Sequence, residues 1–161
     1  MLHLIPAPLH RTLSRLADRV RRVWWRVRKP RRRSVNVIAF DERGRVLLVR
    51  HSYGPPVWAL PGGGIDRNED PEAAARREFR EELGCGIEEL AAIEAIRQEV
   101  SGSKDLMYLF VATIAGTPAP YMREIVELGY FDPAGLPGNV DRRIAERVRQ
   151  ALALRAGPSP S

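Results

Sequence analysis

The chain has 161 residues, of which 44% are hydrophobic and 29% charged, a composition typical of a soluble globular protein and not of a disordered or fibrous one. Its formal net charge is +6, and no apolar run approaches the roughly 20 residues that a membrane-spanning helix needs. The single cysteine, Cys85, excludes an internal disulfide framework and is typical of a reducing compartment, so we expect a cytoplasmic protein.

The positive charge is concentrated at the N-terminus. Residues 1–33 hold 11 of the 26 lysines and arginines and a single acid, Asp18. Residues 34–161 hold the other 15 bases and 19 acids, so this part of the chain is mildly acidic. The acidic part gives no electrostatic reason to expect general nucleic-acid binding, and the change in composition predicts a domain boundary near residue 33.

The first predicted element is a basic amphipathic helix between Pro8 and Lys29. Leucines and valines recur there at steps of three and four, with arginines on the opposite side. Trp24 and Trp25 beside arginines are typical of a helix that lies at a membrane surface, and the arginines also suit RNA phosphates. An Arg-rich, acid-poor start is typical of organelle targeting as well. A helix packed on its own domain or on a second subunit, as in a homodimer, is the interpretation that we favour.

The next segments predict a β-hairpin, a glycine-rich loop and a helix. Two β-rich runs at 34–40 and 45–51 are joined by a turn, and a very short extended piece is expected at 57–60. Asp70 can cap the following helix. Pro71 suits the first helical position, where a missing N–H is harmless, and the helix is expected to end at Gly84.

The remainder predicts three strands and a second helix. The strands are expected at 91–100, 106–114 and 125–131, the helix at 141–155 and a flexible tail at 156–161. Strands and helices intermixed in this way favour a mixed sheet with helices packed on it. We therefore expect an N-terminal appendage at 1–33, one α/β domain at 34–155 and a short tail.

The first of these helices carries a cluster of acids in the stretch "ARREFREELG", residues 75–84. Each helical residue turns by about 100°, so Glu82 lies about 40° from Glu78, and Glu81 lies about 60° to the other side. The adjacent stripe, which we expect to be buried against the sheet, consists of Ala75, Phe79 and Leu83. The three carboxylates therefore border the buried face of the helix.

Three neighbouring carboxylates favour a bound cation. Like charges three or four residues apart destabilise a helix, and hard cations such as Mg²⁺ or Mn²⁺ prefer carboxylate and carbonyl oxygens. The glycines at 62–64 lie just before Glu69 and the helix, and glycine allows a ligand or metal to approach the backbone closely. Either feature alone is common in proteins. Their juxtaposition is what predicts a metal site.

Residues 63–85 resemble the Nudix box, G-x5-E-x7-R-E-U-x-E-E-x-G-U, in which U is a bulky apolar residue. The matching positions are Gly63, Glu69, Arg77, Glu78, Phe79, Glu81, Glu82 and Gly84, with the smaller Cys85 at the last apolar position. The flanking pattern resembles Nudix domains over roughly residues 34–155, whereas residues 1–33 lie outside the resemblance.

The resemblance implies an α/β/α sandwich that uses Mg²⁺ or Mn²⁺ to hydrolyse a nucleoside diphosphate linked to another moiety. The implied metal ligands are Glu78, Glu81, Glu82 and the carbonyl of Gly63. Arg77 would orient a carboxylate, and Glu69 would hold the loop against the helix. The catalytic base would be Glu78, Glu82 or an acid of a later segment, Glu124 or Glu127, and we favour Glu124.

Substrate contacts are expected outside the box. Arg50 is a candidate for a phosphate, and the candidate base-stacking residues are Tyr53, Trp58, Tyr108 and Phe110. Phe110 also suits the core, and Trp58 also suits packing of the loop. A proline typical of many ADP-ribose pyrophosphatases is absent, because Val100 and Ser101 stand at the corresponding positions. A tyrosine typical of many dinucleoside-polyphosphate hydrolases is absent as well.

Two other functions remain open at this point. A noncatalytic nucleotide-sensing module would use the same fold, although it would have little need for three carboxylates. Alternatively, the basic helix at 1–33 would be the main functional part and would bring the domain to a membrane surface or to RNA. The partner expected in either case includes a nucleotide-derived small molecule.

Overall fold

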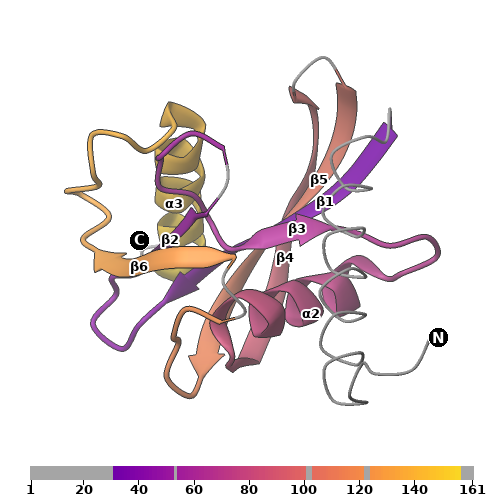
Figure 1. Cartoon of the computed structure of the whole chain (residues 1–161). Helices are drawn as coiled ribbons and strands as arrows, with labels where there is room; N and C mark the ends of the chain where they lie inside the picture. Colours follow the sequence, from indigo (N-terminus) through magenta and orange to yellow (C-terminus); the bar gives the residue numbers. More distant parts are fainter. Residues whose placement is uncertain (1–30, 53, 101–102, 122–123, 157–161) are drawn as a thin grey trace, which may run out of the picture.

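The computed structural model describes residues 31–52, 54–100, 103–121 and 124–156 (Figure 1). One sheet is formed by strands in the order β4-β5-β1-β2-β6, with β3 paired to β1. The strands are β1 (Arg31–Phe40), β2 (Val46–His51), β3 (Gly62–Gly64), β4 (Gly86–Val100), β5 (Ser103–Ala115) and β6 (Ile125–Phe131). The helices are α2 (Pro71–Leu83) and α3 (Arg142–Ala156).

The sheet is mixed, as the sequence predicts. β1 and β5 are parallel, and Phe40 lies opposite Thr113 at the end of their shared register. The other strand pairs are antiparallel, including β4 with β5 and β2 with β6. β3 pairs with the first half of β1, which brings the glycine-rich segment into the middle of the sheet.

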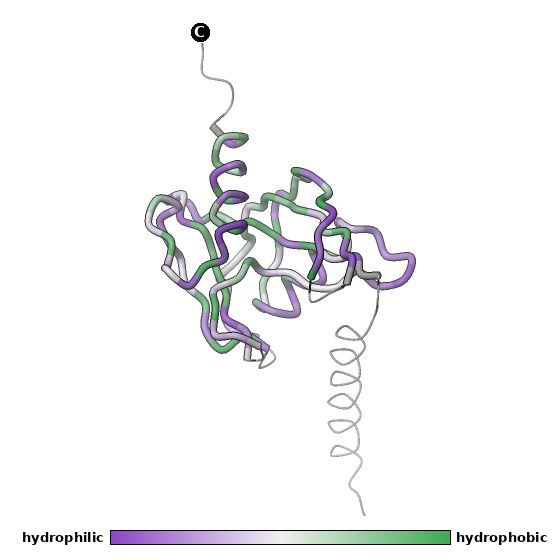
Figure 2. Tube along the Cα trace, turned by 90° about the horizontal axis from the view of Figure 1, so that it is seen from above, coloured by the Kyte–Doolittle hydropathy of each residue, from purple (hydrophilic) through white to green (hydrophobic). Residues whose placement is uncertain are grey.

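The two helices lie on opposite sides of this sheet (Figure 1). On one face, α2 contributes Phe79 and Leu83, both fully buried, to a core with Val37 of β1. On the other face, α3 contributes Ile144 and Val148 to a second core. Hydrophobic and hydrophilic residues alternate along α3, as expected for a helix with one buried side (Figure 2). The predicted α/β/α sandwich is confirmed.

Local signals place α2 where the sequence predicts it. The Asp70 side chain accepts hydrogen bonds from the backbone N–H groups of Glu72 and Ala73, at 2.9 and 3.2 Å. Gly84 ends the helix with a φ of 66°, a left-handed conformation that favours glycine. The predicted limits of α2 and of the strand at 125–131 are confirmed.

Three strands, β1, β4 and β5, are longer than predicted because pairing across the sheet extends them, and β5 spans Ser103–Ala115 where 106–114 was expected. β1 begins at Arg31, since residues 31–33 pair with residues 104–106 of β5. β4 begins at Gly86, five residues before the predicted start, and follows β5 through two irregularities that interrupt its alternation. Such shifts hide an edge strand from a search for strict alternation.

The predicted N-terminal helix and the tail from residue 157 lie outside the described residues. The predicted domain boundary near residue 33 therefore stays a prediction. Among the helices that the structure describes, none has both the length and the apolar character needed to cross a membrane.

Candidate functional site

The acidic residues of α2 border its buried face. Glu78 and Glu82 each have an exposed fraction of only 2%, whereas the side chain of Glu81 is 45% exposed. Burial of a carboxylate is unfavourable unless hydrogen bonds or opposite charges stabilise it. Two buried glutamates one turn apart are therefore a feature that the surrounding residues must support.

Arg77 provides much of this support. Its guanidinium makes a bidentate pair with Glu69, with Nε–Oε1 and Nη2–Oε2 distances of 2.7 and 2.8 Å. Its Nη1 also donates to Oε1 of Glu78 at 2.7 Å, and its Nη2 donates to the carbonyl of Gly64 at 2.9 Å. The hydrogen bonds to Glu69 raise the pKa of Arg77 above its ordinary value, and the charge of Glu78 adds to this effect against the opposing effect of burial. Arg77 therefore stays charged and fixes one buried acid to the loop.

Glu69 closes the loop between β3 and α2. Besides Arg77, its carboxylate accepts a hydrogen bond from the backbone N–H of Asp66 at 2.8 Å. Asn68, the residue before it, has a φ of 64°. These contacts connect the loop to α2, which is the role that the resemblance implies for Glu69.

Glu82 is held from two sides. Its Oε2 accepts a hydrogen bond from the backbone N–H of Gly62 at 3.0 Å. Its Oε1 lies 3.8 Å from Nδ1 of His51, at the end of β2. Burial lowers the pKa of His51, which favours the neutral imidazole. His51 was not among the predicted site residues, although alternation along β2 places it on the same face as the buried Val49.

Gly63 lies directly against Glu78. A Cβ atom at this position would be 2.6 Å from both Cδ and Oε2 of Glu78. Since real Cβ atoms do not approach other atoms so closely, any larger residue would displace the carboxylate or the loop. The absence of a side chain at Gly63 thus allows the backbone of β3 to contact a buried acid.

These residues fit a hard divalent cation by their chemistry and position. Carboxylates of Glu78, Glu81 and Glu82 and the backbone at Gly63 offer only oxygen ligands, which Mg²⁺ and Mn²⁺ prefer. In the part of the chain that the structure describes, no three His, Cys, Asp or Glu side chains converge on a common point as a metal site. Glu78 instead accepts a hydrogen bond from Arg77, and Glu82 accepts one from the backbone N–H of Gly62, and these contacts stabilise the two carboxylates.

The two later acids occupy different positions. The backbone carbonyl of Glu124 accepts a hydrogen bond from Ser52 N–H at 2.8 Å, so this residue lies beside the end of β2 that carries His51. Glu127 pairs with Arg50 through an Nη1–Oε2 contact of 2.6 Å. Of the two, Glu124 is attached to the segment that borders Glu82.

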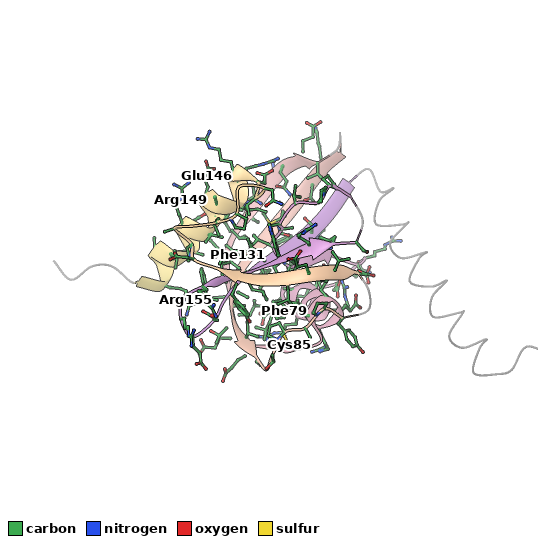
Figure 3. All side chains as sticks on the ribbon, turned by 60° about the vertical axis from the view of Figure 1, so that its left-hand side comes forward. Phe79, Cys85, Phe131, Glu146, Arg149 and Arg155 are labelled. Atoms are coloured by element: carbon green, nitrogen blue, oxygen red, sulfur yellow. The ribbon has the colours of Figure 1, made fainter. Side chains whose placement is uncertain are left out.

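Two of the predicted substrate residues, Arg50 and Trp58, lie apart from the acids. Arg50 has its Cζ 5.8 Å from the ring of Trp58, and Trp58 packs edge-on against Phe131 with centroids 4.8 Å apart. Trp58 belongs to the core on the α3 side, so it and Arg50 lie across the sheet from α2. Figure 3 shows Phe131 near α3 and Phe79 near α2. Tyr53 lies outside the described residues.

Tyr108 and Phe110 lie on the same face as the acids. Phe110 is buried in the core beneath α2, as its alternative interpretation predicts. Tyr108 is half-buried at the border of that core, and Cζ of Arg33 lies 5.5 Å from the centroid of its ring. Only Tyr108 of this pair keeps part of an aromatic ring available to a ligand.

Comparison with known protein families gives one match over most of the chain. A family model described as the NUDIX domain matches residues 30–153. These residues include all the described strands, α2 and nearly all of α3. The matched region contains every predicted metal ligand and Arg77.

Curated relatives match over a shorter region. RNA pyrophosphohydrolase of Rhodospirillum rubrum is 46% identical over 55 residues, which is 34% of this chain and 33% of the relative. RNA pyrophosphohydrolase of Halorhodospira halophila is 40% identical over 67 residues, 42% of this chain and 36% of the relative. The chain thus matches about a third of the length of these relatives.

Solved structures match over nearly the whole described region. A MutT NUDIX hydrolase from Burkholderia pseudomallei has a TM-score of 0.67 and 27% identity, covering 76% of this chain and 98% of that protein. An Ap4A hydrolase from C. elegans has a TM-score of 0.68 and 21% identity, covering 78% of this chain and 98% of that protein. The second likeness concerns the fold alone.

Proposed function

The chain belongs to the NUDIX domain family, and from this premise we propose that it hydrolyses a phosphoric anhydride bond in a nucleoside polyphosphate or a nucleoside diphosphate derivative. The observation that supports this proposal is the pair of buried carboxylates, Glu78 and Glu82, held against a glycine-rich loop. A domain that only folded around this helix would have little reason to bury two acids at 2% exposure.

In this proposal, Mg²⁺ or Mn²⁺ would be held by Glu78, Glu81, Glu82 and the carbonyl of Gly63. Bound there, the cation would neutralise phosphate charge and lower the pKa of a coordinated water. The chain itself provides the preorganisation. Arg77 fixes Glu78 through its 2.7 Å contact, and the backbone N–H of Gly62 fixes Glu82.

Glu124 is our proposed catalytic base, which takes a proton from the attacking water. Its support is positional, because its backbone lies beside Ser52, the neighbour of His51, and His51 faces Glu82. Glu82 is the second candidate for this role. Arg77 is proposed as a positioning residue, because its guanidinium is engaged by Glu69, Glu78 and Gly64.

The proposed substrate class includes free nucleotides and the 5′ polyphosphate end of RNA. The inclusion of RNA in this class is supported by the curated relatives, which are named RNA pyrophosphohydrolases and match this chain only in part. Arg50 and Trp58 remain proposed substrate contacts, although they would have to meet a substrate that reaches the α3 side of the sheet. We also propose that residues 34–155 form the hydrolase unit, to which residues 1–33 are attached.

A substrate panel tests this function. The full-length protein is incubated with ADP-ribose, dNTPs, oxidised dNTPs, dinucleotides, capped RNA and 5′-triphosphorylated RNA, each with Mg²⁺ or Mn²⁺. We expect release of a nucleoside monophosphate, or of pyrophosphate from RNA, for at least one member. Tight nucleotide binding without turnover of any member would instead support the noncatalytic sensing module.

A further inference from the structure

One end of the sheet, formed by β1, β4 and β5, extends past α2 (Figure 1). The strand registers identify the residues on its α2-side face. Tyr108 pairs with Ala95, and both positions lie in phase with the buried Phe110 beneath α2. Two residues further along, Leu106 pairs with Arg97, and then Lys104 pairs with Glu99. These positions therefore share the face that carries the acidic helix.

Basic side chains predominate on this exposed face. Arg33 of β1, Arg97 of β4 and Lys104 of β5 are all exposed, and Glu99 is the acid beside them. Arg33 lies over the ring of Tyr108, at 5.5 Å from Cζ to the centroid. We call Arg33, Arg97, Lys104 and Tyr108 the basic sheet face. It combines cations with an aromatic ring, and proteins that bind single-stranded nucleic acids use this combination to contact phosphates and stack on bases.

The basic sheet face is continuous with the candidate site. Nη1 of Arg33 donates to the backbone carbonyl of Glu69 at 3.4 Å, and the backbone carbonyl of Arg33 accepts from Ile65 N–H at 2.9 Å. Glu69 is in turn the bidentate partner of Arg77, which binds Glu78. A ligand on the basic sheet face therefore lies next to the loop that supports the acids.

The chain changes from basic to mildly acidic near Arg33, which belongs to the basic sheet face. Ten of the chain's bases precede Arg33 in the sequence, and β1 enters the sheet beside Lys104. The rest of the chain is mildly acidic, and the acids of α2 would repel a polyphosphate. The basic sheet face and the segment that precedes it in the sequence therefore offer positive charge to an extended polyanion.

We propose that the basic sheet face binds the single-stranded chain of an RNA whose 5′ polyphosphate is hydrolysed at the acids of α2. This proposal rests on the proposed function and names the substrate within its class. Arg97 and Lys104 contact phosphates of the first nucleotides, and Tyr108 stacks on a base. A free mononucleotide has no nucleotide chain to lie along the basic sheet face, so we expect it to gain nothing from Arg97 and Lys104.

A membrane surface is the other polyanionic partner that suits basic residues. Binding at a bilayer interface is strengthened by large apolar side chains that enter the headgroup region. On this face the large apolar side chain of Leu106 is half-buried, and the exposed neighbours of Arg97 and Tyr108 are Ala92 and Ala95, which offer little apolar surface. The described residues therefore favour RNA over lipid.

The test compares two full-length double variants. Arg97→Gln with Lys104→Gln removes two charges of the basic sheet face, whereas Arg142→Gln with Arg149→Gln removes two exposed charges from α3 on the other side of the sheet. Arg149 is labelled on α3 in Figure 3. Steady-state kinetics are measured with a 5′-triphosphorylated 20-nucleotide RNA and with a mononucleotide substrate. Binding of the same RNA with a 5′ hydroxyl is measured over a range of salt concentrations.

For the variant of the basic sheet face, we expect KM for RNA to rise about tenfold with kcat unchanged, because two phosphate contacts are lost. The slope of log K against log salt should decrease by about 1.4, the value for two phosphates of a single strand. Mononucleotide kinetics should not change, and the α3 variant should behave as the unmodified protein does.

Equal RNA kinetics and equal salt slopes for the two variants would overturn the proposal. So would loss of binding to vesicles containing phosphatidylserine with RNA binding unchanged, which would identify the face as a lipid-binding surface. Failure of the proposed hydrolysis is distinguishable, because it removes turnover of every substrate. The 5′-hydroxyl RNA still reports directly on the basic sheet face in that case.

Discussion

At the scale of single residues, Arg77 connects the loop, the helix and the buried acids. Its contacts with Glu69, Glu78 and Gly64 all lie between 2.7 and 2.9 Å. Charge-assisted and bidentate hydrogen bonds of this kind are stronger than neutral ones and restrict orientation. The carboxylate of Glu78 is therefore positioned before any substrate arrives.

Glu82→Gln should abolish most of the activity without unfolding the protein. The amide keeps an oxygen that can accept the hydrogen bond from Gly62 but loses the negative charge. We expect kcat to fall by about 10²–10⁴-fold, the range for loss of an acid–base or comparably placed catalytic group. Enzyme kinetics and thermal unfolding check this, with Glu146→Gln on the exposed side of α3 as the control (Figure 3). A near-normal rate would remove Glu82 from the site.

Gly63→Ala should separate the loop from the acid. The added Cβ would lie 2.6 Å from Cδ of Glu78, and overpacking of this kind destabilises a folded protein by about 1–3 kcal/mol. We expect lower stability and weaker Mn²⁺ binding, measured by thermal unfolding and calorimetry. Gly138→Ala is the matched control, because no atom lies within 4 Å of its added Cβ. Equal Mn²⁺ affinity in the two variants would contradict the assigned position of Gly63.

The sequence predicts which acids border the core but not the direction of each carboxylate. Helical spacing alone identifies Glu78, Glu81 and Glu82, because a helix fixes their relative angles. The contacts of Glu82 with Gly62 and His51 depend on β2 and β3 and have no signal within the helix. Alternation along β2 separates Arg50 from His51, and this signal could have indicated that Arg50 points away from the acids.

At the scale of elements, α2 owes its limits to local signals. Asp70 caps its first turn and Gly84 ends it, and both are readable from the sequence. The parallel pairing of β1 with β5 is not readable in this way, because it joins residues about seventy positions apart. The predicted start of β1 was too late because this parallel pairing extends it, whereas the irregular register with β5 hid the start of β4.

Asp70→Ala should destabilise the domain by about 1 kcal/mol, because the first turn of α2 loses its cap. For a chain of this size, the melting temperature should fall by roughly 2–4 °C. Asp70→Asn is the control, since its side-chain oxygen still accepts from Glu72 and Ala73. A melting temperature that falls equally in both variants would show that charge, and not capping, stabilises this end of the helix.

At the scale of the whole molecule, one sheet separates two cores, and the acids border the core beneath α2. Cys85 belongs to the same core, with an exposed fraction of 9% (Figure 3). Burial raises the pKa of the Cys85 thiol, so little reactive thiolate is present at neutral pH. The thiol therefore reports on the integrity of this core.

Iodoacetamide should label Cys85 slowly in the folded protein and rapidly in denaturant. We expect the folded rate to be at least about tenfold lower, because both access and thiolate formation are restricted. Mass spectrometry of timed samples measures the rates, and addition of Mg²⁺ should not increase labelling. Equal rates in the folded and unfolded protein would contradict the burial of Cys85.

The central claim is that this molecule is a hydrolase that depends on a divalent cation. Its most direct test is the turnover of the best substrate of the panel by EDTA-treated protein, measured while Mg²⁺ is titrated back. We expect no turnover without the cation and a saturable return of the full rate, absent in Glu82→Gln. A rate that is independent of the cation, or equal in Glu82→Gln, would contradict the account.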